Sequence, residues 1–380
     1  RAAFPALASG VTFLDNAGGS QVLASVAERV RDYLCSTSVQ LGASYPTSRE
    51  AGERVHGAVC ETAAYIGARD PAEVVFGGST TQLLANLALA LEPTLAAGDE
   101  LVITNADHQA NLGPWQRLAH RRGLVLREWS LDRDTHRLEP AALARLLTPR
   151  TRLVAFPHVS NLLGSIHDIR AITQLVHSAG AQVCVDGVAY APHRGIDVTA
   201  WDVDYYVFSI YKVYGPHVAV LYGKRELLEA LPTINHNFIT QLPYKLQPGN
   251  VNFELTYGAA AVWPYLARVG FDEIAVHEAA LAERLLGFLR DRPHVHIHGD
   301  VRSDASVRVP TISFTVDGRE PDEIVRAVDA RNIGIRHGDF YSKGVVAAFG
   351  VPSVIRISAV HYNTLAEIDH TVAALEAAGV

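Results

Sequence analysis

The sequence predicts an α/β protein with a mostly parallel sheet, helices on both of its faces, and a smaller α/β domain behind it. Three observations predict this fold. At 380 residues the chain is longer than one hydrophobic core usually serves. Short β-branched or aromatic runs alternate with Ala- and Leu-rich helical patterns through its first two-thirds. Beyond about residue 250, a long helical pattern is followed by alternating strands.

The apolar runs in the first part of the chain are short and rich in Val, Ile, Leu and aromatic residues, which is typical of buried strands. They occupy residues 73–76, 101–104, 124–126, 152–156, 182–185 and 205–208. The helical patterns between them occupy residues 81–91, 111–122, 139–147 and 169–179. This alternation indicates βαβ units around a parallel sheet.

The last third of the chain predicts the second domain. Its helical patterns occupy residues 271–290, 322–331 and 365–377. Its strand patterns occupy residues 294–298, 311–315 and 354–358. We therefore expect a large domain over residues 16–265, a small domain over 266–380 and an N-terminal arm over 1–15.

Charge and composition exclude several classes of protein. With 33 basic and 40 acidic residues the net charge is −7, which argues against a nucleic-acid partner. No apolar run is long enough for a membrane helix, and the first residues lack the apolar core of a secretory signal. The cysteines are an odd number without a CxxC pair, which favours a reducing, cytoplasmic location. They are Cys35, Cys60 and Cys184.

A lysine follows the predicted strand 205–208, in the segment Ser209-Ile-Tyr-Lys-Val-Tyr-Gly-Pro216. Lys212 there has aromatic and apolar neighbours and is expected to be partly desolvated. Desolvation lowers the pKa of an amine and favours the neutral form that attacks carbonyl groups. A surface lysine on a turn is the alternative.

Two further motifs lie at the ends of predicted strands. Asp186 closes the apolar strand 182–185, at the carboxyl edge where open α/β sheets bind ligands. Such a carboxylate either binds a cationic partner, such as a protonated pyridine nitrogen, or caps a turn. Gly77-Gly-Ser-Thr-Thr81 joins a strand to a helix, so the hydroxyls of Ser79, Thr80 and Thr81 and nearby N–H groups could hold a phosphate. An ordinary helix N-cap has the same appearance.

In combination, these motifs resemble fold-type I enzymes that use pyridoxal 5′-phosphate (PLP), in the class V aminotransferase and cysteine desulfurase group. The resemblance extends from Phe13-Leu-Asp-Asn-Ala-Gly-Gly-Ser20 to Arg356-Ile-Ser-Ala-Val-His-Tyr-Asn363. It implies a large domain with a seven-stranded, mostly parallel sheet and a smaller C-terminal α/β domain. It also implies a PLP-dependent transferase or lyase that acts on an α-amino acid.

The resemblance implies a role for each matching residue. Lys212 would carry the cofactor covalently and later move the Cα proton, and Asp186 would keep the pyridine nitrogen protonated. His108 matches the histidine that stacks on the cofactor ring, with a buried structural histidine as the alternative. Asn161 matches the residue near the phenolic oxygen of the cofactor. Thr80, Thr81 and Ser209 would hold the phosphate, with Ser79 and the Tyr211 hydroxyl available to it.

Other matches concern the partner subunit and the substrate. Gly249 and Asn250 match a segment that reaches the neighbouring subunit's phosphate, which implies a homodimer with shared active sites. Arg356 matches the arginine that binds the substrate's α-carboxylate, and its planar fork suits that group. A structural ion pair is the alternative for Arg356. Arg336 is a second candidate for the carboxylate.

The sequence departs from this pattern at two positions. Tyr341 stands where desulfurases carry the cysteine that accepts sulfur, so an enzyme persulfide is not expected. Ala189 stands where many relatives have a Gln or His bonded to the cofactor's phenolic oxygen. His294, His296 and His298 share one face of a predicted strand, but carboxylate or thiol ligands are missing from that strand, so we expect no metal there.

We therefore expect a PLP enzyme that performs C–S lyase (β-elimination) or aminotransferase chemistry. Racemisation or epimerisation on the same fold, or a PLP-binding regulatory protein without turnover, are the alternatives. A nucleotide-dependent oxidoreductase is disfavoured because Gly77-Gly-Ser-Thr80 is a poor match to the glycine-rich dinucleotide-binding turn.

Overall fold

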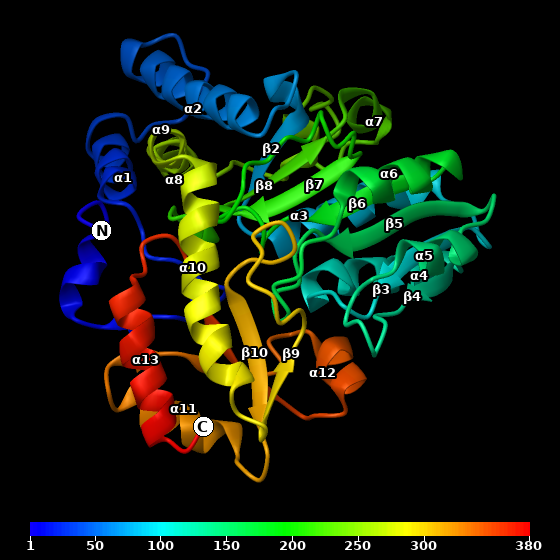
Figure 1. Ribbon diagram of the computed structural model, residues 1–380. Coiled ribbons are helices and arrows are strands. Elements are labelled where there is room, and N and C mark those ends of the chain that lie inside the picture. The colour runs from blue at the N-terminus through cyan, green and yellow to red at the C-terminus, as the bar shows by residue number, and fades with distance from the viewer.

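The computed structural model describes residues 1–380 and has two sheet-centred parts (Figure 1). The larger part is built on a seven-stranded sheet with the order β2-β8-β7-β6-β5-β3-β4. Its strands are β2 (Val74–Gly77), β3 (Glu100–Thr104), β4 (Val125–Trp129), β5 (Thr151–Pro157), β6 (Gln182–Asp186), β7 (Tyr205–Ser209) and β8 (Ala219–Gly223). Only the two pairings of β8 are antiparallel. The predicted seven-stranded, mostly parallel sheet is confirmed.

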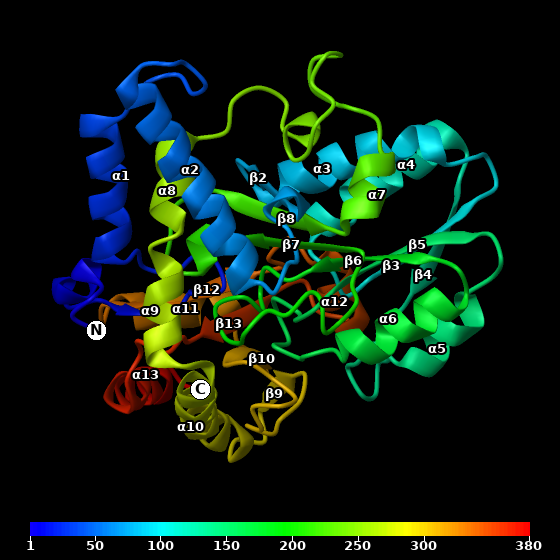
Figure 2. The ribbon, with the colours of Figure 1, turned by 90° about the horizontal axis from the view of Figure 1, so that it is seen from above.

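Helices cover both faces of this sheet, as Figure 2 shows. On one face lie α3 (Thr80–Leu91), α4 (Gly113–Arg122) and α7 (Arg225–Ala230). On the other lie α5 (Pro140–Leu146) and α6 (Ile169–Ser178). Two separate clusters of buried apolar side chains fill the two layers. Because both faces are covered, the central strands β6, β7 and β8 are almost entirely buried and mostly apolar, whereas the edge strand β4 is largely exposed.

Four helices beside the sheet were not predicted. They are α1 (Ala24–Ser36), α2 (Pro46–Tyr65), α8 (Phe253–Ala259) and α9 (Val262–Val269). Helix α8 packs against both α1 and α2. In α1 only Val26 and Tyr33 are buried, so its apolar stripe is too thin to identify the helix from sequence.

The smaller part has a four-stranded antiparallel sheet with the order β12-β13-β10-β9. Its strands are β9 (Val295–His298), β10 (Thr311–Val316), β12 (Arg336–Gly338) and β13 (Val354–Ser358). Its helices are α10 (Phe271–Arg290), α11 (Pro321–Asp329), α12 (Lys343–Phe349) and α13 (Leu365–Ala377). The N-terminal strand β1 (Thr12–Phe13) pairs in parallel with β11 (Ile333–Gly334), which joins the arm to this part.

Helix α10 contributes side chains to two different hydrophobic cores. Ile274 packs in a core of the large sheet, whereas Leu281 packs in the core of the small one, together with Leu14 of the arm. The division that we predicted between residues 265 and 266 lies one helix earlier, within α9.

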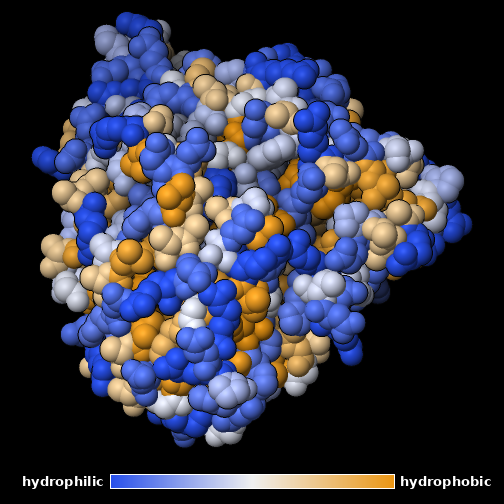
Figure 3. All heavy atoms as spheres, in the orientation of Figure 1, coloured by the Kyte–Doolittle hydropathy of each residue, from blue (hydrophilic) through white to orange (hydrophobic).

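The surface in the orientation of Figure 1 mixes apolar and polar side chains, with several separate apolar patches (Figure 3). No helix has both the length and the apolar character needed to cross a membrane.

The smaller part is hydrogen-bonded to a loop of the larger part that follows the carboxyl end of β5. Ser313 donates a hydrogen bond to the Leu162 carbonyl at 2.7 Å, and the Val309 N–H donates one to the Gly164 carbonyl at 2.9 Å. Gly164 has a φ of +67°, and a Cβ there would lie 2.5 Å from the carbonyl oxygen of Thr311. The close approach of these two backbones therefore requires glycine.

We expect Gly164→Ala to lower the free energy of unfolding by about 3 kcal/mol, since it adds a backbone clash to the strain of a positive φ. Gly180→Ala is the control, because Gly180 has a φ of +77° and open space around its Cβ position. It should cost only about 1–2 kcal/mol. Urea unfolding measures both, and equal losses would contradict the close-approach argument.

Candidate active site

Lys212 ends a short 3₁₀ turn (Ile210–Lys212) directly after β7 and is buried, with 9% of its surface exposed. Burial lowers the pKa of its amine to about 8. The charge of Arg356 lowers it further, while Asp186 and Asp15 oppose the shift. The alternative of a surface lysine is wrong. With a pKa of about 8, about a tenth of the amine is neutral at pH 7, far more than for an ordinary lysine.

Asp186 is the last residue of β6, next to β7 in the sheet, and its carboxylate is buried. It accepts a hydrogen bond from the backbone N–H of Val188 at 2.9 Å. Burial raises its pKa to about 6, although that hydrogen bond and the nearby Lys212 work in the opposite direction. A cationic partner would offset this burial, as the sequence analysis anticipated.

His108 follows β3 at the same edge and lines the same cavity as Asp186 and Lys212. Its Nδ1 accepts a hydrogen bond from the Ala110 N–H at 3.0 Å. Burial lowers its pKa to about 4, with further lowering from Lys212 and Arg356, so its imidazole is neutral at pH 7. A neutral, fixed ring fits the predicted role of stacking on an aromatic cofactor.

Asp107 also lines this cavity, and the sequence analysis missed it. Its carboxylate is 1% exposed and accepts hydrogen bonds from Asn111 at 2.6 Å and from the His108 N–H at 2.9 Å. Burial raises its pKa well above the ordinary value, and the charge of Asp186 adds to this effect. An aspartate just before the candidate histidine was the signal that could have identified it.

The start of α3 forms a cradle for an anion. Ser79 caps the helix by accepting a hydrogen bond from the Gln82 N–H at 3.1 Å, which leaves the N–H groups of Thr80 and Thr81 without helical partners. The hydroxyls of Thr80 and Ser209 are hydrogen-bonded at 2.6 Å across the cavity wall. Tyr211 completes this wall. All five residues line the cavity that contains Lys212, and their phosphate contacts stay a prediction.

Asn161 and Ala189 line the same cavity. The Asn161 side chain donates to the Phe340 carbonyl at 3.2 Å and accepts from the Ser342 hydroxyl at 2.8 Å. Its amide is therefore oriented by the small domain. Ala189 contributes no polar atom, so this wall lacks the donor that many relatives were expected to have.

Arg356 lies on β13, 2% exposed, beside the Asn161 loop. Its Nη1 donates to the Asn161 carbonyl at 3.2 Å, and its Nη2 pairs with Asp15 Oδ1 at 2.7 Å. The guanidinium lies 3.8 Å from the centre of the Phe340 ring. The alternative of an ion pair is thus present, and Asp15 is a second residue that the sequence analysis missed.

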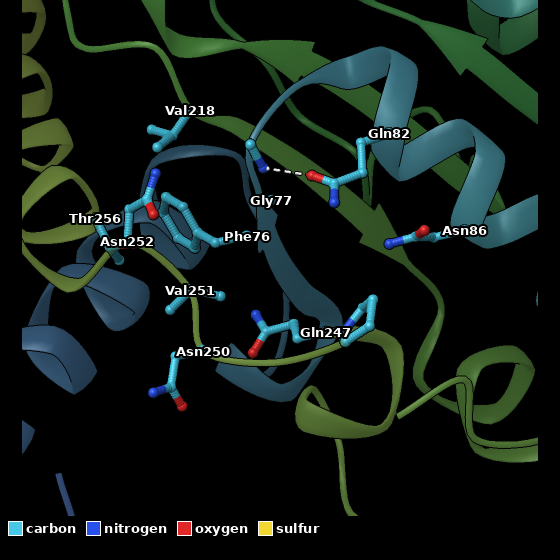
Figure 4. Close-up of a pocket in the computed structure, with 12 residues that line it drawn as sticks. Phe76, Gly77, Gln82, Asn86, Val218, Gln247, Asn250, Val251, Asn252 and Thr256 are labelled. Carbon is cyan, nitrogen blue, oxygen red and sulfur yellow. Dashed lines mark hydrogen bonds between the residues drawn. The ribbon is translucent and has the colours of Figure 1, made fainter. Parts of the chain in front are cut away.

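Asn250 does not line the Lys212 cavity. It lies on the loop before α8, in a neighbouring polar cavity that also includes Gly78 and Gln82 (Figure 4). Its side chain donates a hydrogen bond to Gln40 at 3.1 Å. Within one chain Asn250 makes no contact at this site, and the resemblance assigned its phosphate contact to the neighbouring subunit.

Tyr341 is 66% exposed, and its ring centre lies 5.3 Å from that of His108. No cysteine lies in this region. Cys35 is on α1, Cys60 is on α2, and Cys184 is fully buried in β6.

Two of the three histidines of the predicted strand 294–298, His296 and His298, lie on β9 of the small domain. His296 pairs with Asp317 at 2.8 Å, and His298 is hydrogen-bonded to Thr315 at 3.1 Å. The structure contains no group of three or more His, Cys, Asp or Glu side chains arranged to hold a metal ion.

The cavity has the features that PLP requires. A buried carboxylate suits the protonated pyridine nitrogen, a desolvated amine suits the aldehyde, and free N–H groups at a helix start suit the phosphate. The three features line one cavity, so the residues present fit the cofactor.

The model of one protein family, described as Aminotransferase class-V, matches residues 12–371. The chain belongs to the class V aminotransferase family. It is therefore a PLP-dependent enzyme of fold type I.

Individual relatives agree with this assignment. An aminotransferase-like protein of Gibberella zeae is 44% identical over 391 residues, covering 99% of this chain and 96% of that protein. A cysteine desulfurase-like protein of Aspergillus flavus is 36% identical, covering 97% and 87%. The crystal structure of a cysteine desulfurase from Escherichia coli has a TM-score of 0.91 at 28% identity, covering 100% of this chain and 97% of that one.

We expect borohydride to trap PLP on Lys212, with an adduct yield that rises with pH to a plateau and has its midpoint near pH 8, because the amine must be neutral to react. Lys224 is an internal control. Burial lowers its pKa, but hydrogen bonds to Asp202 and Asp204 outweigh burial and raise it overall. Peptide mass mapping locates the adduct, and an equal yield in Lys212→Ala would contradict the assignment.

Proposed function

We propose that the enzyme acts on an α-amino acid and breaks a C–S bond at Cβ by β-elimination, without forming a persulfide on the protein. One observation carries the amino-acid part of this proposal. The Lys212 amine and the Asp186 carboxylate line one cavity, and the Arg356 guanidinium lies beside it. The sulfur-related names of the Aspergillus flavus and Escherichia coli relatives support the C–S bond as the one that breaks.

Each of these residues has a physical task. Bound PLP supplies an electron sink for the pair left behind when a bond to Cα breaks. Lys212, with a pKa of about 8, accepts the Cα proton. Asp186, a buried carboxylate in the cavity wall, would hold the pyridine nitrogen of the cofactor and favour its protonated form. Arg356 binds the α-carboxylate and limits the orientations of Cα.

The bonds of the elimination balance without a further reactant except water. Lys212 takes the proton from Cα, the electron pair of that bond forms the Cα–Cβ double bond, and sulfur leaves Cβ with its own pair as a thiolate or sulfide. Water then releases ammonia and a 2-oxo acid. Transamination begins with the same proton removal but transfers the amine to a second oxo acid. The name of the Gibberella zeae relative favours it as the second candidate.

Residue 341 supports release of the sulfur product without a protein persulfide. A phenol at Tyr341 cannot take up sulfane sulfur at neutral pH, and burial raises the pKa of the Cys184 thiol well above its ordinary value. The other two cysteines, Cys35 and Cys60, lie on the helices α1 and α2. All three thiols are unpaired, which supports a cytoplasmic location for the enzyme.

With L-cysteine as the trial substrate, we expect sulfide and pyruvate in equal amounts and no sulfane sulfur on the wild-type protein. Tyr341→Cys should acquire protein-bound sulfane sulfur, because it places a thiol on an exposed segment near His108. Tyr341→Ser is the matched control without a thiol. Sulfane sulfur on the wild-type chain would contradict the proposal, and alanine formed in place of pyruvate would point to a desulfurase.

We also propose a homodimer in which each chain completes its partner's site. Asn250 supports this arrangement because it lies on an exposed loop, outside the cavity of its own chain. Phe238 and Tyr244 on the preceding loop are 81% and 54% exposed, a large apolar area for a monomer to leave in water.

Mixing the inactive Lys212→Ala chain with Asn250→Ala chains should restore activity. In a mixed dimer one site then carries both defects and the other carries neither. After subunit exchange of equal amounts, about half of the dimers are mixed and each has one intact site, so we expect about a quarter of the wild-type rate, with light scattering giving the mass of a dimer. Gln40→Ala, which removes only the hydrogen-bond partner of Asn250, is the control. A monomeric mass, or no recovery despite exchange, would contradict a shared site.

A further inference from the structure

The guanidinium of Arg356 already holds a carboxylate that belongs to the protein. Asp15 Oδ1 lies 2.7 Å from Nη2, and the Asn161 carbonyl accepts from Nη1 at 3.2 Å. The third nitrogen, Nε, is buried and has no hydrogen-bond partner. A carboxylate that binds an arginine through two parallel bonds would satisfy Nε as well, which Asp15 does not do in this arrangement.

Asp15 has a second cation within reach. Its other oxygen, Oδ2, lies 3.5 Å from Nη1 of Arg336, which is 56% exposed. Two guanidiniums therefore share one carboxylate, next to the buried Lys212 amine. This group of charges has an excess of positive charge, and one additional carboxylate would neutralise the two arginines.

The two partners of this ion pair differ in freedom. Arg356 is 2% exposed and covered by Phe340, whereas the Asp15 side chain is 26% exposed. The backbone of Asp15 is fixed by a bridge to Ser358, so only its carboxylate can turn. Glycine at position 18 leaves room for that carboxylate, because a Cβ there would lie 2.9 Å from Asp15 Oδ2. Asp15 can therefore move from Arg356 toward Arg336, while Arg356 stays in place.

We propose that Asp15 is an exchangeable stand-in for the substrate's α-carboxylate. It holds Arg356 in the free enzyme, and the incoming carboxylate displaces it onto Arg336. This inference rests on the proposed amino-acid substrate. Asp15 and Arg336 are then positioning residues that act through Arg356. The net binding free energy of the substrate carboxylate is the difference between its own interaction with Arg356 and that of the Asp15 carboxylate.

The test uses holoenzyme and α-methylalanine, an amino acid without a Cα proton to lose, with binding measured by calorimetry. Isopropylamine, the same molecule without its carboxylate, reports any change at the Lys212 end of the site. We expect Asp15→Asn to bind α-methylalanine roughly tenfold more tightly, because a neutral amide competes for Arg356 less well than a carboxylate does. The affinity for isopropylamine should not change. Asp369→Asn, in an exposed pair with Arg284, is the control and should change neither.

The role of Arg336 is tested by a double-mutant cycle. Arg336→Gln removes the partner of the displaced Asp15, so we expect α-methylalanine to bind roughly two- to fivefold more weakly. In the Asp15→Asn background the same change should have no effect, since no charged side chain then needs a partner. Thermal unfolding of each variant with and without α-methylalanine checks that the chains are folded.

Weaker binding in Asp15→Asn would overturn the inference, because it would make Asp15 a fixed support for Arg356. An Arg336→Gln effect that persists in the Asp15→Asn background would also overturn it, since Arg336 would then contact the ligand itself. In both cases the wild type still binds the amino acid more tightly than the amine, and the proposed substrate class stands. Equal binding of α-methylalanine and isopropylamine by the wild type and by Asp15→Asn would overturn both.

Discussion

The constraint on which the rest of this structure depends is the burial of charges of both signs around one cavity. Burying an isolated charge costs free energy. The three central groups, Lys212, Asp186 and Arg356, therefore need one another or a ligand as charge partners. Asp186 opposes the lowering of the Lys212 pKa, and Arg356 adds to it. Together with burial, these charges set the pKa of the Lys212 amine at about 8. Rigid strands supply the positions, since Asp186 ends β6, Lys212 follows β7 and Arg356 lies within β13.

Hydrogen bonds from Arg356 and from two serines connect the two domains. Arg356 of the small domain donates to the Asn161 carbonyl, Ser313 binds the next carbonyl along, and Ser342 orients the Asn161 side chain. The loop that faces the cofactor is therefore shaped by residues more than 150 positions away in the chain. A shift of the small domain would therefore move Arg356 and the Asn161 wall of the cavity together.

The sequence identified the groups that act through local context and missed those that act through distant partners. Lys212 follows one apolar strand and Asp186 closes another, and this pattern made both residues candidates, with a surface lysine and a turn-capping aspartate as alternatives. Asp15 meets Arg356 across 341 residues, and nothing near Asp15 indicates that contact. The sheet was predictable because its central strands are buried, short apolar runs, whereas α1 buries only two side chains. The antiparallel strand β8 went unnoticed because it follows the Gly-Pro break closely and no helix separates it from β7.

The segment Phe340–Tyr341 has an unusual backbone conformation and lies beside the candidate active site. Both residues have positive φ values, 50° and 59°, which cost energy for non-glycine residues and persist only where contacts hold them. The contacts are present. The Tyr341 carbonyl accepts from the Gln109 N–H at 2.8 Å, and the Phe340 ring covers Arg356. Tyr341 stands where the desulfurase pattern has a cysteine, and the ring of the preceding residue, Phe340, lies over the Arg356 guanidinium. A change of side chain at this segment therefore leaves the backbone and its contacts in place, so the reaction depends on the side chains that the fold carries and not on the fold itself.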